Sequence, residues 1–266
     1  MPVSQRDPMR LRETFDEAAE LYDRARPAYP AALFSDLAEL ACIGPGCRLL
    51  EIGCGTGQAT LPLAERGCEI VCVELGASLA AVARRKLARF RSVRVEVAAF
   101  EAWPLPPEPF DTVVAATAFH WIDPAVRVTT SARALRQGGA LATIATHHIA
   151  GGDAQFFAEV QACYEQWDPA TPPGLRLPGA DEISFDSQEL RGSGQFGSAT
   201  FRRYESELAY STAQYLETLL TYSGHRALAP EARRGLLACI AELIEPRYGG
   251  HIRKRYLSEL RAAYRT

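Results

Sequence analysis

The stretch Leu49-Leu50-Glu51-Ile52-Gly53-Cys54-Gly55-Thr56-Gly57 decides the fold of this chain. An apolar run that carries Glu51 ends in three alternating glycines, and a second apolar run ends near Glu74. Glycine permits sharp turns and close approach of a ligand to the backbone, because it has no Cβ. Glu74 lies 17 residues after Gly57, near the place where nucleotide-binding α/β units hold ribose hydroxyls with an acidic side chain. The pattern predicts a nucleoside site at a strand–loop–helix junction.

The glycine spacing separates two kinds of nucleoside ligand. The dinucleotide fingerprint is G-x-G-x-x-G, with the pyrophosphate at a helix N-terminus. Here the third glycine comes one residue early, at Gly57, and Gln58 takes the place of the last glycine. The Glu51 carboxylate would repel a diphosphate and suits a ligand with a cationic amino-acid end. A nicotinamide-dependent oxidoreductase is therefore a less favoured alternative. The other alternative is that the glycines form only a turn between a strand and a helix and bind no ligand.

The E-x-G-x-G-x-G arrangement resembles the first motif of class I S-adenosylmethionine-dependent methyltransferases. The resemblance implies that the glycine loop contacts the methionine part of the donor and that Glu74 holds the ribose. It implies S-adenosylmethionine as cofactor and S-adenosylhomocysteine as product. The donor-binding residues that it implies in this part of the chain are Glu51, Gly53, Cys54, Gly55, Gly57, Glu74, Leu75, Ala99, Phe100, Glu101 and Thr117.

One segment departs from the family pattern. After the third strand many members carry an Asp that binds the adenine amino group, whereas this chain has Ala98-Ala99-Phe100-Glu101. Adenine recognition is then expected from the backbone N–H of Phe100, with Glu101 or another group replacing the Asp.

Other segments resemble the small-molecule branch called methyltransferase type 11, which includes trans-aconitate-type carboxyl methyltransferases. They are Phe110-Asp111, the run from Ala118 to Asp123, and an N-terminal stretch containing Phe15, Tyr22 and Arg26. The likeness runs from about residue 12 to the C-terminus. These motifs do not identify the acceptor.

The order of the elements predicts an α/β fold, a Rossmann-like doubly wound sheet of seven mostly parallel strands with the last strand antiparallel. The expected strands are 48–53, 69–75, 93–98, 111–119, 140–146, 201–210 and 251–261. The expected helices are 31–42, 57–66, 77–90, one opening at Asp123-Pro124, 153–167, 212–223 and 230–245.

We expect a single methyltransferase domain over 1–266. Within it, 12–45 would form N-terminal cap helices, 46–150 the donor-binding core, 151–200 a helical and loop insertion that serves as a substrate lid, and 201–266 the C-terminal strands and helices. The segment 168–199 is rich in Pro, Gly and Asp and is longer than an ordinary connection, which is typical of functional loops.

Methyl transfer from a sulfonium needs positioning more than acid or base chemistry, because the donor is already activated. A carboxylate acceptor needs no base. His120, at the carboxyl edge of the sheet, is either a base or acceptor-orienting donor, or a packed histidine. Phe119 and Trp121 are expected to wall the acceptor pocket, and His147 to face the same cleft. Arg176 and Arg191 in the insertion are either acceptor-binding residues or, as we favour, exposed loop arginines.

Tyr22 and Arg26 precede the first strand, and we expect one of two roles for them. In the first, the N-terminal segment closes over the donor, with Arg26 binding its carboxylate and Tyr22 supplying an aromatic surface. In the second, both side chains cover one face of the sheet.

Composition excludes several classes of partner. Hydrophobic residues make up 47% and charged residues 23%, and the net charge is −3, which gives no general attraction for nucleic acid. The basic residues near the C-terminus are expected to form a solvated strand or helix face rather than an RNA site: Arg253, Lys254, Arg255, Arg261 and Arg265. No apolar run reaches the length of a membrane span, and the first ten residues lack the apolar core of a signal peptide. We therefore expect a cytoplasmic monomer or homodimer without a membrane partner.

The seven cysteines show no metal-ligand spacing, so we expect no metal site and buried, reduced thiols. Together the patterns predict an S-adenosylmethionine-dependent methyltransferase that acts on a small-molecule acceptor through a carboxylate or hydroxyl group. The alternative is a non-catalytic adenosylmethionine-binding protein, since the donor site is visible in the sequence and the acceptor site is not.

Overall fold

The computed structural model describes residue 12 and residues 15–266, so the expectation about the first ten residues lies outside the described part. Contacts within the chain group these residues into two compact units. The first unit contains the described residues up to Pro27, together with His147–Ser184 and Glu205–Leu257. The second contains Ala28–Thr146, Phe185–Tyr204 and Ser258–Thr266.

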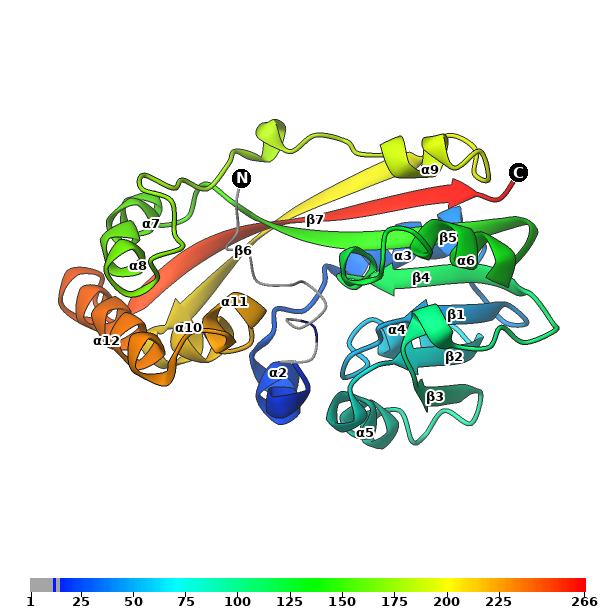
Figure 1. The fold of residues 1–266 in the computed structure, drawn as a ribbon, viewed down its shortest axis with the longest axis horizontal. Coiled ribbons are helices and arrows are strands. Elements are labelled where there is room, and N and C mark those ends of the chain that lie inside the picture. The colour runs from blue at the N-terminus through cyan, green and yellow to red at the C-terminus, as the bar shows by residue number, and fades with distance from the viewer. Residues whose placement is uncertain (1–11, 13–14) are drawn as a thin grey trace. The chain divides into compact units, whose positions relative to one another are not determined.

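The strands of the described chain form one seven-stranded sheet in the order β3-β2-β1-β4-β5-β7-β6 (Figure 1). It is mostly parallel with an antiparallel pair formed by the last strand, which confirms the predicted fold class. Leu50 at the centre of β1 lies opposite Val71 of β2 and Val113 of β4. The strands are β1 (Arg48–Ile52), β2 (Glu69–Glu74), β3 (Val93–Val97), β4 (Phe110–Ala116), β5 (Leu135–Ile149), β6 (Thr200–Ser211) and β7 (His251–Tyr264).

The helices connect these strands in the alternating order predicted for a doubly wound sheet. The α-helices are α2 (Ala19–Ala25), α3 (Ala31–Leu40), α4 (Thr60–Ala64), α5 (Ala77–Lys86), α6 (Arg127–Ala134), α7 (Ala154–Glu159), α8 (Gln161–Trp167), α9 (Gln188–Gly192), α10 (Thr212–Leu219), α11 (Ser223–Arg226) and α12 (Pro230–Arg247). The 3₁₀ turns are η1 (Asp16–Ala18), η2 (Phe100–Ala102), η3 (Phe119–Trp121) and η4 (Ala180–Glu182).

Several predicted elements differ in their bounds from the observed ones: the helix expected to open at Asp123 begins at Arg127, the strand expected from 140 begins at Leu135, the helix expected over 57–66 is α4, and the stretch 212–223 holds α10 and the start of α11. Two further differences have a local cause. The helix predicted over 153–167 is two helices, because the side-chain Nε2 of Gln161 donates to the carbonyl of Phe157 at 3.0 Å. In an unbroken helix that carbonyl accepts the backbone N–H of Gln161. The strand predicted to reach Phe119 ends at Ala116, because Thr117 takes a positive φ of 53° that leaves the extended region.

Alternating side chains of β1 divide the core of the second unit between the two faces of the sheet. Leu49 packs with α3 and α4 on one face, in the same cluster as Leu33. Leu50 and Ile52 pack on the other face with Val128 of α6. This alternation is what period-two side-chain geometry requires of a strand buried on both faces.

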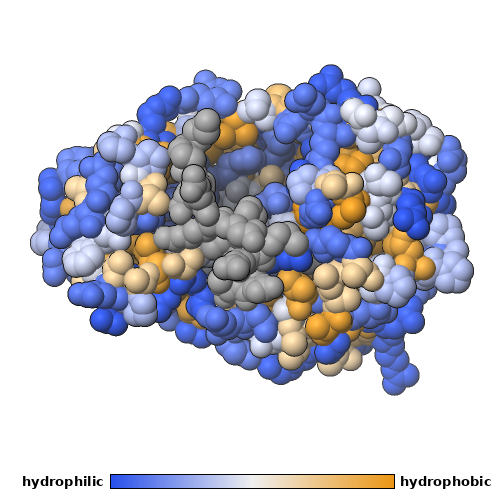
Figure 2. Space-filling model, viewed as in Figure 1, coloured by the Kyte–Doolittle hydropathy of each residue, from blue (hydrophilic) through white to orange (hydrophobic). Residues whose placement is uncertain are grey.

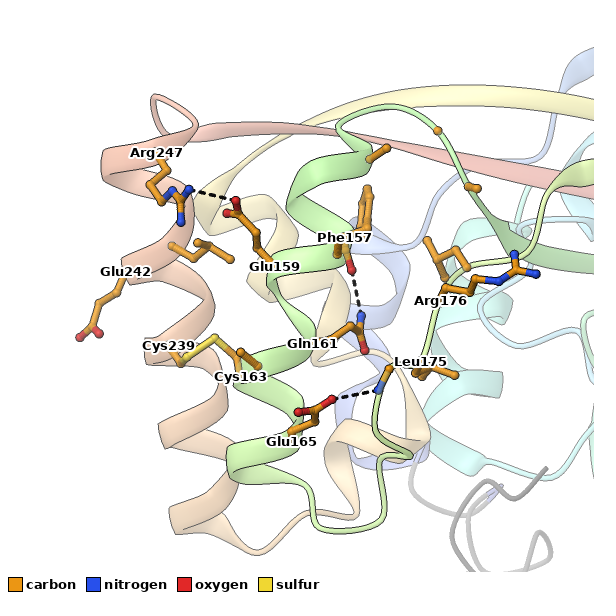
Figure 3. A pocket seen from close by; sticks show the side chains of 18 residues that line it. Phe157, Glu159, Gln161, Cys163, Glu165, Leu175, Arg176, Cys239, Glu242 and Arg247 are labelled. Atoms are coloured by element: carbon orange, nitrogen blue, oxygen red, sulfur yellow. Dashed lines mark hydrogen bonds and ion pairs between the residues drawn. A yellow bond between two sulfur atoms is a disulfide. The ribbon is translucent and has the colours of Figure 1, made fainter.

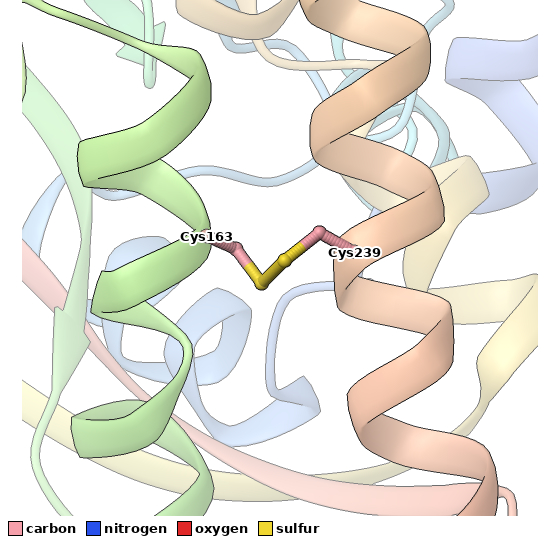
Figure 4. Close-up of a disulfide and its surroundings, with 2 residues drawn as sticks. All are labelled: Cys163 and Cys239. Carbon is pink, nitrogen blue, oxygen red and sulfur yellow. A yellow bond between two sulfur atoms is a disulfide. The ribbon is translucent and has the colours of Figure 1, made fainter.

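The first unit has its own core, in which helices α7, α8, α10 and α12 bury aromatic and aliphatic side chains against the strand residues Tyr210, Ile252 and Tyr256. A disulfide between Cys163 of α8 and Cys239 of α12 links two of these helices (Figure 4). The expectation of reduced, buried thiols is therefore wrong for this pair, and also for Cys42, which is exposed. The fold brings Cα atoms 76 residues apart to within 5.8 Å, a juxtaposition that spacing in the sequence does not show.

The face seen in Figure 2 carries mostly hydrophilic residues, with hydrophobic residues in small groups. Large hydrophobic side chains that are exposed include Val97, Leu175 and Phe185. No helix in the described residues is both long and apolar enough to cross a membrane.

The disulfide generates a stability prediction. Closing so long a loop restricts the unfolded chain, an effect worth about 2–4 kcal/mol. We expect the double substitution Cys163→Ala/Cys239→Ala, and reduction of the wild-type protein, to lower the free energy of unfolding by about that amount. Urea titration of both proteins with and without reductant measures it, with Cys42→Ala as the control. Equal midpoints for wild type in oxidising and reducing buffer would show that the two thiols are not bonded in solution.

Candidate functional site

The glycine loop begins where β1 ends and turns the chain through backbone conformations that other residues rarely adopt. Gly53 and Gly55 have positive φ angles of 67° and 56°. A Cβ on Gly53 would lie 2.6 Å from the Cβ of Ala118, in the loop after β4. The absence of a side chain at Gly53 therefore allows the loop after β1 to approach the loop after β4.

Glu74, the last residue of β2, is nearly buried and holds two backbone segments. One carboxylate oxygen accepts the N–H of Gly55 and the other accepts the N–H of Gly76, each at 2.8 Å. A carboxylate has about four acceptor positions, so these two bonds leave capacity for further donors such as ribose hydroxyls. The sequence pointed to Glu74 as a ligand-binding residue but did not show that it also fixes the glycine loop.

Glu51 has no exposed surface, and its Oε1 atom has no hydrogen-bond partner among the described residues. Burial, the largest cause, and the nearby Glu74 together raise the pKa of this carboxyl group to about 7 against a lowering contribution from Thr60. A buried carboxylate is stable only when it is paired or protonated. The unpaired oxygen therefore fits a cationic group, as expected of the amino-acid end of S-adenosylmethionine. The hydroxyl of Thr56 in the same loop is also buried without a partner.

The segment after β3 forms the η2 turn, and its side chains have contacts within the protein. Phe100 begins the η2 turn and is buried in the core, while Ala99 and Leu75 are half-buried. Glu101 accepts the backbone N–H of Asp123 at 3.3 Å. Adenine recognition by the Phe100 N–H and Glu101 stays a prediction.

The end of β4 carries an unusual backbone conformation at Thr117, which is not a glycine and yet has positive φ. Such conformations cost energy and gather at functional sites. The Thr117 hydroxyl bonds that of Tyr29 at 2.8 Å, and its N–H donates to Ile144 of β5 at 2.7 Å. Nothing in the sequence indicates this contact between Tyr29 and Thr117.

The three aromatic residues after β4 lie in the η3 turn in different environments. Phe119 is buried in the core, Trp121 is half-buried and His120 is exposed. The rings of His120 and Trp121 lie 4.8 Å apart. Their expected roles as base and pocket wall stay predictions.

The remaining predicted site residues belong to the first unit. The Arg26 guanidinium lies over the rings of Tyr22 and Tyr222, at 4.8 and 4.4 Å from their centroids, and donates to the carbonyl of Thr221. His147 is half-buried near the end of β5. The donor roles of Tyr22 and Arg26 and the acceptor role of His147 stay predictions.

A groove of about 980 Å³ in the first unit is lined by α7, α8, residues 174–177 and α12 (Figure 3). The disulfide lies in its wall, and Arg247 and Glu159 form an ion pair at 2.9 Å. Arg176 at its edge is exposed and binds Glu182 through two hydrogen bonds, as expected of a loop arginine. Arg191 is also exposed, but it lies in helix α9 and not in a loop. The groove contains no residue of the predicted donor site.

Comparison with known proteins supports a methyltransferase. Residues 50–143 match the family model described as a methyltransferase domain. An uncharacterised methyltransferase of Mycobacterium tuberculosis is 34% identical over 144 residues, 54% of this chain and 55% of that protein. The malonyl-[acyl-carrier protein] O-methyltransferase of Geobacter sulfurreducens is 31% identical over 173 residues, 64% of this chain and 63% of that protein. The chain thus spans little more than half the length of the curated relatives it matches first.

A solved structure described as a candidate type II methyltransferase of Anaeromyxobacter dehalogenans is 26% identical with a TM-score of 0.56. The alignment covers 89% of this chain and 97% of that one. Residues 50–143 are thus similar to a methyltransferase domain, and the fold matches that of the solved structure.

Glu74 is the residue whose removal should weaken donor binding most clearly. We expect Glu74→Ala to lower the affinity for S-adenosylhomocysteine at least tenfold, because charge-assisted hydrogen bonds contribute about 1.5–3 kcal/mol each. The glycine loop also loses the anchor of its Gly55 N–H. Titration calorimetry measures the affinity, with Glu69→Ala at the exposed start of β2 as the matched control. Equal affinities for wild type and Glu74→Ala would remove Glu74 from the site.

Glu51 generates a prediction for the pH dependence of donor binding. With its pKa raised to about 7, the free protein holds a proton on Glu51 at pH 6 that a cationic ligand must displace. The affinity for S-adenosylhomocysteine should therefore fall roughly tenfold between pH 8 and pH 6. Glu51→Gln should bind more weakly at pH 8 and show a flat profile. The same slope in both proteins would assign the proton to another group.

Proposed function

We propose that the protein transfers a methyl group from S-adenosylmethionine to a small-molecule acceptor. The observation that carries the proposal is the buried Glu51 carboxylate, whose Oε1 has no hydrogen-bond partner among the described residues, beside a glycine loop that Glu74 holds in place. A dinucleotide would bring a diphosphate towards this loop, which a buried carboxylate repels. A ligand with an ammonium group relieves the cost of burying Glu51.

Different residues of the second unit bind different parts of the donor. Glu51 binds the ammonium group, Glu74 accepts the ribose hydroxyls, and the backbone of the glycine loop contacts the methionine chain. The donor supplies an activated methyl group, so the protein's part is to fix its orientation and exclude water. The N–H of Phe100 and the Glu101 carboxylate complete the adenine side of the site.

For the acceptor we propose a carboxylate or hydroxyl group on a small molecule, as in trans-aconitate-type methyltransferases. The name of the Geobacter relative, an O-methyltransferase that acts on malonyl-acyl-carrier protein, supports methylation of a carboxyl oxygen. With a hydroxyl acceptor, the exposed His120 beside Trp121 is the base that removes the proton. The net charge of −3 supports a small molecule rather than nucleic acid as partner.

The experiment that tests the proposal has two stages. Mass spectrometry of the purified protein should detect bound S-adenosylhomocysteine, and calorimetry should detect its binding but not that of a nicotinamide dinucleotide. A screen with radiolabelled S-adenosylmethionine and a panel of acids, phenols and amines should then show methyl transfer. Absence of donor binding would overturn the proposal. Donor binding without transfer to any class in the panel would favour the non-catalytic binding protein.

A further inference from the structure

The disulfide of the first unit lies in the wall of the groove described above (Figure 3). Its two sulfur atoms differ in environment, because Cys163 of α8 is only 4% exposed whereas Cys239 of α12 is half-buried. A molecule that enters the groove therefore reaches the Cys239 side of the disulfide first. This distinguishes the pair from the four buried free cysteines of the second unit, which are Cys47, Cys54, Cys68 and Cys72.

The groove gives a small molecule room to approach the disulfide. Its volume is about 980 Å³, and Ala158 and Ala162 line it with short, exposed side chains. Ala162 directly precedes Cys163 in α8. An accessible disulfide can react with a thiolate, which attacks one sulfur atom and forms a mixed disulfide, and access decides which sulfur is attacked. The groove therefore favours attack at Cys239.

The helices that carry the two cysteines have other contacts that keep them together. A Cβ on Gly235 of α12 would lie 2.5 Å from the ring of Trp167 of α8, so this ring packs directly on the backbone of α12. Leu236 and Ile240 of α12 are fully buried in the core of the same unit. Opening the disulfide therefore leaves α8 and α12 packed, with both sulfur atoms close enough to form the bond again.

The ionisable residues of the groove give it an excess of negative charge. Both of its arginines pair with an acid. The exposed carboxylates of Glu165 and Glu242 have no cation partner among the described residues, and Glu242 lies one helical turn after Cys239. A cationic thiol is therefore attracted to the groove and an anionic thiol is repelled, an effect that salt weakens because both carboxylates are exposed.

We propose that Cys239 is a thiolation site, at which a small cationic thiol opens the disulfide. The thiolate attacks Sγ of Cys239, so a bond forms between the two sulfur atoms while the bond from Cys239 to Cys163 breaks. The electron pair of the broken bond stays on the sulfur of Cys163, which takes up the proton that the attacking thiol released. One disulfide replaces another, so the step consumes no oxidant or reductant.

The modification is reversible and changes the groove. The Cys163 thiol stays beside the mixed disulfide and can attack it, which releases the small thiol and restores the original bond. While the adduct exists, the bound thiol occupies the groove and α8 has no covalent link to α12. The reaction needs neither a methyl donor nor an acceptor, so it is a property of the first unit beyond the proposed function.

The test treats the full chain, without oxygen, with cysteamine, 2-mercaptoethanol or 2-mercaptoethanesulfonate as the cationic, neutral and anionic thiol. Excess N-ethylmaleimide in urea stops the reaction, and peptide mass spectrometry locates the products. We expect early samples to carry cysteamine on Cys239 and N-ethylmaleimide on Cys163. Each rate is divided by the rate of the same thiol with hydroxyethyl disulfide, and the ratio should be about threefold higher for the cationic than for the anionic thiol.

Two pairs of variants separate the groove from the general reactivity of a disulfide. Ala162→Leu should slow the reaction about tenfold, because the longer side chain obstructs the approach to Cys239. Gln166→Leu changes an exposed position of α8 outside the groove and should react like wild type. Glu242→Gln should reduce the preference for the cationic thiol, and Glu231→Gln, at the exposed start of α12, should keep it.

Three results would overturn the inference. The first is alkylation of both Cys163 and Cys239 by N-ethylmaleimide in protein that has met no thiol, since the two would then not be bonded. The second is reduction of the disulfide with the adduct mainly on Cys163, or with no adduct on Cys239 in any early sample. The third is a rate that Ala162→Leu leaves unchanged in protein that melts like wild type. None of these results bears on methyl transfer.

Discussion

The carboxylate of Glu74 joins segments of the chain that the donor site requires to be close together. It ends β2, accepts the N–H of Gly55 in the loop after β1, and accepts the N–H of Gly76 before α5. The backbone carbonyl of the same residue accepts the N–H of Ala98 after β3. Glu74 thus fixes the carboxyl ends of three parallel strands. It also supports the glycine loop, whose glycines have positive φ angles and no side chains that could hold them. A ligand that binds Glu74 adds to an arrangement that already exists.

Glu51, unlike Glu74, lowers the stability of the ligand-free protein, because its carboxylate is buried. Folding raises the pKa of Glu51 from 4.5 to about 7. The protonated carboxyl group therefore stabilises the folded state fully only below pH 4.5, and this contribution to the free energy of unfolding is lost as the pH rises towards 7. The loss is about 3 kcal/mol, which is a substantial part of the stability of an ordinary domain. A cation beside Glu51 would recover this free energy in the complex. The strand holds Glu51 on the face of Leu49, so the position is imposed by the alternation of β1 and the carboxylate cannot turn towards water.

The sequence predicted the fold around the glycine loop well, because the information there is local. Glu51 lies near the end of β1 and Glu74 ends β2, where the sequence placed them, and the glycines mark turns with positive φ angles. The fold class follows from the alternation of strands and helices. The prediction that the fourth strand reaches Phe119 was wrong, because threonine is not a residue type that indicates a positive φ. In the structure, the positive φ of Thr117 accompanies its hydrogen bond with Tyr29.

The first unit could not be predicted in the same way, because its important contacts join residues far apart in the chain. Cys163 and Cys239 meet only when α8 and α12 pack together, and Lys254 is buried only because helices and aromatic rings from other segments enclose β7. In sequence, Lys254 is one of three consecutive basic residues, and alternation along the strand alone would expose two and bury one. The buried one is the lysine, for which the described residues supply no ion pair, while both arginines have acidic partners. Glu51 and Lys254 are therefore similar exceptions in the two units, because each is a charged side chain at a buried position where packing alone would favour an apolar one.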